Sequence, residues 1–87
     1  MTIHDTANIH EEFNRLSDMQ AGDKFEIMYL AKEWDDAQRT RDIGLYEHVE
    51  GRILQKHKSK MLVYTNGTRL AIGNSVADNI YVRRLKR

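Results

Sequence analysis

The clearest alternation of apolar and polar positions in the chain flanks the Asn-Gly pair at 66–67. Asn-Gly supplies the two positive φ angles of a type I′ turn, whose twist matches the strands that it joins. A two-residue loop pairs Val63 with Leu70, and the other strongly apolar residues then fall on the same face. The pattern predicts a hairpin of strands 60–65 and 68–73.

Residues 24–31 also alternate between two faces, which predicts a strand whose second face is largely covered. The first face carries Phe25, Ile27, Tyr29 and Ala31. The same region through Trp34 also fits a helical spacing, and periodicity alone does not decide between the two.

Near the N-terminus, apolar residues recur at intervals of three and four: Ile9, Phe13, Leu16 and Met19. This spacing predicts an amphipathic helix over residues 8–20. Asn8 is placed to cap its first turn, and Gly22 is placed to end it.

The rest of the chain divides into short segments within a single domain, 1–87. Polar residues predict an exposed loop at 35–42, and apolar alternation predicts strands at 45–56 and 80–85, followed by a basic tail at 86–87. The expected fold class is α+β: the N-terminal helix packs on a strongly bent antiparallel sheet, or on a small, partly open barrel, of about five strands.

The composition restricts the chemistry that the chain can perform. There are no cysteines, which excludes disulfides, thiolate zinc sites and cysteine nucleophiles and favours a reducing, cytoplasmic location. The N-terminus lacks the basic and apolar regions of a signal peptide, and no apolar stretch is long enough to cross a bilayer. We therefore expect a cytoplasmic chain with no membrane partner.

Charge is distributed very unevenly along the chain. Residues 1–50 carry twelve acidic and five basic residues, whereas residues 51–87 carry nine basic residues and one acid. Such an imbalance indicates an electrostatic partner. The alternative is that the two halves interleave on folding, so that their fields largely cancel.

No catalytic or metal-binding pattern is present in the sequence. The four histidines lack the spacing that would bring ligands to one point: His4, His10, His48 and His57. Acidic residues lie in polar stretches, and no serine has an elbow sequence or a recognisable base partner. We expect a non-enzymatic protein with no cofactor, no metal and no catalytic residue.

Cations and tyrosines are interleaved in the second half of the chain. Clustered cations bind phosphates and tyrosine rings stack on unpaired bases, so this mixture on a sheet is typical of proteins that bind single-stranded nucleic acid. The predicted contact residues are Arg52, Lys56, Lys58, Lys60, Tyr64, Arg69, Tyr81, Arg83 and Arg84.

The order of these segments resembles the small SH3-like barrels, in particular the Sm-like type. The resemblance rests on Val49–Ile53, Met61–Tyr64, Leu70–Asn74 and Ile80–Val82, with the bend of one strand at a glycine. It implies the barrel architecture and a family tendency to bind RNA. Where the Sm-like proteins carry an Asp and an Asn for base recognition, this chain has Lys56–Lys60, so neither uridine recognition nor ring assembly is expected.

Two functional hypotheses follow from these patterns. The first is a non-enzymatic module that binds RNA or single-stranded DNA through the basic sheet face. The alternative is a small adaptor or inhibitor of the viral or mobile-element type, which docks on a host or partner protein through its acidic N-terminal half. A homo-oligomer is also possible, because acidic and basic patches or sheet edges of two copies can pair.

Overall fold

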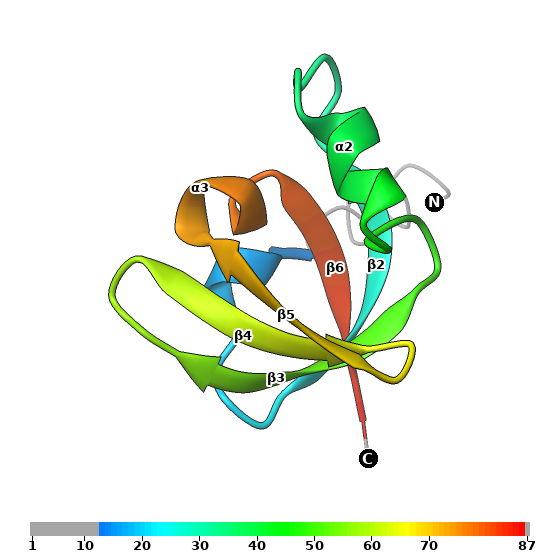
Figure 1. Cartoon of the computed structure of the whole chain (residues 1–87). Coiled ribbons are helices and arrows are strands. Elements are labelled where there is room, and N and C mark those ends of the chain that lie inside the picture. Colours follow the sequence, from blue (N-terminus) through cyan, green and yellow to red (C-terminus); the bar gives the residue numbers. More distant parts are fainter. Residues whose placement is uncertain (1–12, 87) are drawn as a thin grey trace, which may run out of the picture.

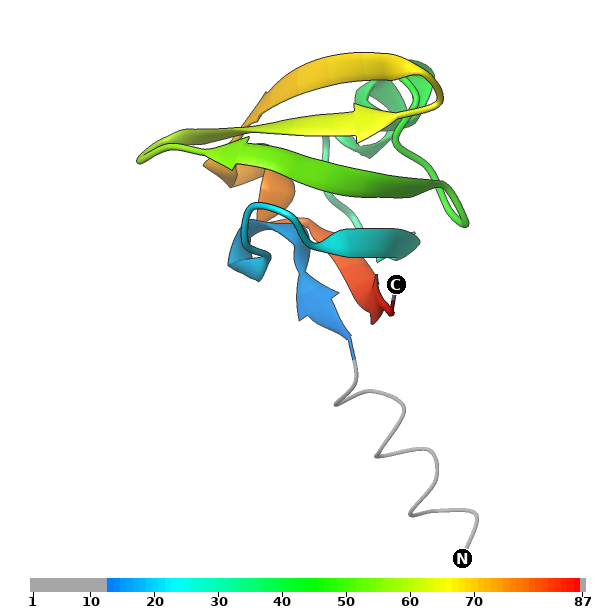
Figure 2. The same cartoon turned by 90° about the horizontal axis from the view of Figure 1, so that it is seen from below.

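A computed structural model describes residues 13–86, which form a curved antiparallel sheet with short helical segments (Figure 1). The elements are β1 (Asn14–Arg15), the 3-10 helix η1 (Leu16–Asp18), β2 (Lys24–Leu30), α2 (Ala37–Asp42), β3 (Glu50–Lys56), β4 (Lys60–Thr65), β5 (Thr68–Gly73), α3 (Asn74–Ala77) and β6 (Ile80–Leu85). All strand pairs are antiparallel, in the order β1-β6-β2-β3-β4-β5. Figure 2 shows the sheet bent so that β3, β4 and β5 lie over β6 and β1.

The core fills the space enclosed by this bend, and strands β2 to β6 all contribute to it. Its members include Phe25, Ile53, Val63, Ile72 and Val82, all of which are buried. Fully burying a side chain of this kind stabilises the fold by roughly 1.5–3 kcal/mol. The apolar residues along the strands therefore account for the closure of the sheet.

The predicted hairpin is confirmed, because β4 and β5 have the predicted bounds and the predicted register. Val63 pairs with Leu70, and both turn residues take positive φ angles, 52° at Asn66 and 78° at Gly67. The predicted strand at 80–85 is likewise confirmed as β6.

The predicted α+β fold class is wrong, because the fold is mainly β and the long N-terminal helix is not observed in the described part of the chain. Residues 8–12 of that prediction lie outside the described residues. Within the remainder, β1 pairs with β6, and Leu16 and Met19 are buried by a single 3-10 turn. The spacing of three that suggested an α-helix is equally the repeat of a 3-10 turn, and pairing with β6 decides between them.

Residues 24–30 form the strand predicted over 24–31, and the helical alternative for this region is wrong. The predicted alternation fails at Met28, where the register of β2 against β6 shifts between Ile27 and Tyr29. As a result Leu30 is 6% exposed, whereas Tyr29, which was assigned to the same face as the buried Phe25 and Ile27, is 39% exposed. A β-bulge inserts one extra residue and so reverses the faces beyond it.

Two helices fall in segments that carried no helical pattern. α2 occupies most of the predicted loop at 35–42, and its residue Thr40 is buried. α3 follows β5 directly and buries Ala77. β3 begins at Glu50 instead of residue 45, because the preceding residues cross over to the core as a loop in which Leu45 is buried.

Candidate functional site

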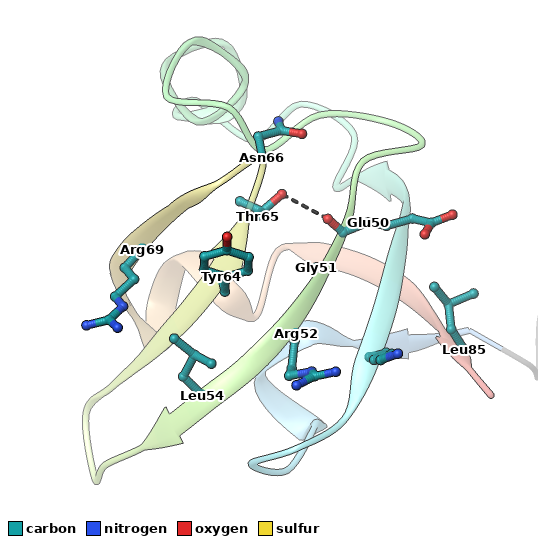
Figure 3. A pocket seen from close by; sticks show the side chains of 10 residues that line it. Glu50, Gly51, Arg52, Leu54, Tyr64, Thr65, Asn66, Arg69 and Leu85 are labelled. Atoms are coloured by element: carbon teal, nitrogen blue, oxygen red, sulfur yellow. Dashed lines mark hydrogen bonds between the residues drawn. The ribbon is translucent and has the colours of Figure 1, made fainter. Parts of the chain in front are cut away.

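A groove with a volume of about 570 Å³ lies on the outer face of the sheet (Figure 3). Strands β2, β3, β4, β5 and β6 and the β4–β5 turn all contribute to it. Its lining residues are Lys24, Glu50, Gly51, Arg52, Leu54, Tyr64, Thr65, Asn66, Arg69 and Leu85.

Strand pairing places five of the lining residues in one row that crosses five strands. In spatial order the row is Leu85, Lys24, Arg52, Tyr64 and Arg69, each paired with the next across neighbouring strands. Directly paired residues have Cβ atoms roughly 4.5–5.5 Å apart and project from the same face. The row therefore forms a continuous line of side chains along the groove.

This row combines positive charge with apolar surface. Lys24, Arg52 and Arg69 are cations, and Glu50 is the one carboxylate among the groove-lining residues. Tyr64 lies between the two arginines with 45% of its surface exposed. The groove can therefore contact an apolar group and anionic groups at the same time.

Gly51 allows the sheet beneath the groove to close. A Cβ atom at this position would lie 2.7 Å from the Phe25 ring and 2.7 Å from the carbonyl oxygen of Tyr64. Beside it, the hydroxyl of Thr65 donates a hydrogen bond of 2.9 Å to the carbonyl oxygen of Glu50. A side chain at position 51 would push β3 away from its neighbours, so the shape of the groove depends on this glycine.

The predicted nucleic-acid contacts fall into three groups, of which one lies in the groove and another borders it, because Arg84 lines an adjoining hollow with Lys24 and Arg52. Arg52, Tyr64 and Arg69 are brought together there, as the pairing of β3, β4 and β5 requires.

The second group, Lys56, Lys58 and Lys60, lies around the β3–β4 turn, away from the groove. Lys56 is four residues beyond Arg52 on β3, roughly 13 Å at the rise of a strand. These lysines are therefore not part of the same surface feature.

The third group lies on β6, where acids from the first half of the chain neutralise the cations. Arg83 pairs with Glu26 at 2.8 Å, and Arg84 pairs with Asp23 at 3.3 Å. Glu26 also lies 3.2 Å from Nδ1 of His48. The hydrogen bond with His48, followed by that from Arg83, holds the pKa of Glu26 below its usual value despite the opposing effect of burial.

Tyr81, the remaining member of this group, stacks on Tyr29. The ring centroids are 4.7 Å apart and the rings are inclined by 13°. Phe13 contacts Tyr29 edge-on, and Nε of Arg15 lies 3.5 Å from the Tyr81 hydroxyl. One face of Tyr81 is thus occupied by a neighbouring ring and is not open to a base.

The sequence prediction missed seven of the ten lining residues: Lys24, Glu50, Gly51, Leu54, Thr65, Asn66 and Leu85. Lys24 and Leu85 enter it through the pairing of β2 with β3 and β6, between segments far apart in the chain. No local sequence signal fixes that register. A hint existed for Leu85, since alternation in 80–85 placed it on the face opposite Ile80 and Val82.

The FeoA domain family matches residues 14–84, which is most of the chain and nearly all of its described part. The chain belongs to this family. Among curated proteins, none matches it.

Solved structures agree with the assignment to the FeoA family. A crystal structure of an iron uptake regulatory protein (FeoA) is 27% identical, with a TM-score of 0.77, over 84% of this chain and 99% of that one. The FeoA protein from Chlorobium tepidum is 28% identical, with a TM-score of 0.75, over 84% of this chain and 71% of that one. A manganese-dependent transcriptional repressor, 17% identical with a TM-score of 0.77 over 84% of this chain and 42% of that one, shares the fold.

Membership of the FeoA family corrects the functional predictions. The expected RNA or single-stranded DNA partner is wrong, and so is the alternative of a viral or mobile-element adaptor that docks through its acidic half. The ion pairs of Arg83 and Arg84 give the physical reason, because acidic and basic segments interleave instead of forming opposed surfaces. The resemblance to a small SH3-like barrel is confirmed at that level.

The described part of the chain contains no helix that is both long and apolar enough to cross a membrane. Nor does it bring together three or more potential metal-ligating residues of the His, Cys, Asp and Glu types.

Proposed function

We propose that this chain is a non-enzymatic regulatory module of a cellular iron-uptake system, and that it acts in the cytoplasm by binding a protein of that system. The observation that carries the proposal is the family match across residues 14–84. It is supported by the likeness to an iron uptake regulatory protein, 99% of which this chain covers at 27% identity.

The surface of the FeoA barrel suits binding better than catalysis. The groove is lined by three cations, one carboxylate, and neutral polar and apolar residues, and it lacks a nucleophile with a neighbouring base. Iron in this proposal is the cargo of the uptake system. The module supplies a docking surface on a small, rigid scaffold.

Uptake of radiolabelled iron tests the proposal in the cells that make this chain. We expect cells lacking the chain to take up iron more slowly, and expression of the wild-type chain to restore the rate. Affinity purification of the chain should also recover a protein required for iron uptake. Equal uptake with and without the chain under iron limitation would contradict the proposal.

A further inference from the structure

We infer that the groove binds an extended, acidic segment of the partner protein, with one apolar side chain of that segment against Tyr64 and Leu54. That the partner is an iron-uptake protein rests on the proposed function. The chemistry of the segment comes from the groove itself.

Charge is the first argument for an acidic occupant. Lys24, Arg52 and Arg69 make no ion pair with any carboxylate in residues 13–86. The arginines of β6 instead each have an acidic partner within the chain. Three cations line the groove against a single lining carboxylate, Glu50, and therefore attract carboxylates, which arginine binds in a bidentate geometry.

The dimensions of the row favour an extended segment. Neighbouring strands are roughly 4.8 Å apart, so the row from Leu85 to Arg69 spans about 19 Å. An extended peptide advances about 3.3 Å per residue, so about six residues cover this length. Such a segment crosses the strands instead of adding to a sheet edge.

An apolar anchor fits between the arginines. Tyr64 is flanked by Arg52 and Arg69 and is 45% exposed, and Leu54 lies on the same groove two residues beyond Arg52. Exposed aromatic rings beside arginines are the residues that most often dominate protein interfaces. The preferred segment thus has an apolar residue with acidic residues on either side of it.

A peptide array tests this inference on the intact chain. Each peptide carries a central leucine flanked on both sides by glutamates, by glutamines or by lysines. We expect the glutamate series to bind most tightly, with an affinity that falls as salt rises. A second series with serine in place of leucine should bind at least tenfold more weakly. Equal binding of the glutamine or lysine series, or no binding by the glutamate series, would overturn the inference.

Variants locate the binding to the groove. Arg52→Gln combined with Arg69→Gln should weaken binding of the glutamate–leucine peptide at least tenfold. Lys56→Gln combined with Lys58→Gln removes the same amount of positive charge from the region of the β3–β4 turn, away from the groove, and should change binding less than twofold. If both double variants weaken binding equally, net charge and not the groove is responsible, and the inference fails.

Tyr64 gives an independent test of the apolar contact. Tyr64→Ala should weaken peptide binding at least fivefold, whereas Tyr64→Phe keeps the ring and should stay within twofold. Binding that is insensitive to Tyr64→Ala would overturn the anchor. Loss of peptide binding with iron uptake still dependent on the chain would reject the inference alone. Confirmed peptide binding in a chain that is dispensable for uptake would reject the proposed function alone.

Discussion

Two regions of this barrel each carry a pair of arginines, and the two pairs have different surroundings. Along β6, Arg83 and Arg84 form ion pairs with Glu26 and Asp23 from the acidic half of the chain. Across β3 and β5, Arg52 and Arg69 line a groove without an acidic partner among the described residues. Local composition does not distinguish the regions. The difference comes from which strand lies opposite, so only the first set serves the fold and the second remains available for a partner.

The largest expected loss of stability comes from a substitution at Gly51, the glycine of β3 beneath the groove. Gly51→Ala places a methyl group 2.7 Å from both the Phe25 ring and the carbonyl oxygen of Tyr64, so β3 must shift. Overpacking of this kind costs roughly 1–3 kcal/mol of unfolding free energy. Chemical denaturation measures it directly.

Gly73→Ala is the matched control for the Gly51 variant. The added methyl group would lie 3.9 Å from its nearest neighbours, an ordinary contact, so we expect the unfolding free energy to change by less than roughly 1 kcal/mol. Equal destabilisation by the two substitutions would contradict the close approach at Gly51.

The next largest effect tests whether the ion pairs of β6 stabilise the fold. Glu26→Gln removes a carboxylate whose side chain is 14% exposed and which contacts both Arg83 and His48. We expect a loss of roughly 1 kcal/mol in unfolding free energy at neutral pH, since charge-assisted hydrogen bonds are lost. Glu50, on the groove side, forms no ion pair within residues 13–86, so Glu50→Gln should have a smaller effect. A larger loss for Glu50→Gln would reverse the roles that we assign to the two regions.

The pH dependence of stability sharpens the same contrast. The pKa of Glu26 is lowered by the hydrogen bonds with His48 and Arg83, and the pKa of Glu47 by the hydrogen bond from Arg41. A carboxylate with a lowered folded-state pKa contributes stability above its unfolded pKa, roughly 4.3 for Glu, and loses it as the pH falls through the folded value.

The wild-type unfolding free energy should therefore fall on acidification below about pH 5, and this fall should be shallower in Glu26→Gln. The two proteins should approach equal stability in strong acid. Parallel pH profiles for wild type and variant would show that Glu26 does not carry the expected linkage.

The smallest expected effect on stability belongs to the groove. Arg52→Gln combined with Arg69→Gln should change the unfolding free energy by no more than roughly 0.5 kcal/mol, because exposed side chains without partners contribute little to the fold. Thermal denaturation of this double variant beside Arg83→Gln provides the comparison. A groove variant less stable than Arg83→Gln would mean that these arginines are structural as well.

Local signals in the sequence predicted local structure well. The Asn-Gly turn set the hairpin and its register, because both strands and the turn lie within fourteen consecutive residues, 60–73. The helix expected at 8–20 was wrong over its described part, because pairing of Asn14–Arg15 with β6 depends on residues far away in the chain. The reversal of faces at Met28 has the same origin, since a bulge is defined by the partner strand.

The candidate site also divides into residues placed by local pairing and residues placed by long-range pairing. Arg52, Tyr64 and Arg69 were among the predicted contact residues, and the structure brings these three together because they lie on consecutive strands joined by short turns. Lys24 and Leu85 were missed because their positions depend on the pairing of β2 with β3 and β6, which are distant in the chain. The charge imbalance along the chain led to the wrong prediction of a nucleic-acid partner. The fold brings Glu26 to Arg83 and Asp23 to Arg84, and this pairing cannot be read from the order of charges in the sequence.

Iron uptake by cells that carry defined variants tests the central claim most directly. Cells lacking the chain are supplied with the wild type, with Arg52→Gln combined with Arg69→Gln, or with Lys56→Gln combined with Lys58→Gln, and radiolabelled iron is followed at equal protein levels. We predict that the wild type and the lysine variant restore uptake and that the groove variant does not. Uptake that proceeds at the same rate in all of these cells, including those with no chain, would contradict the account.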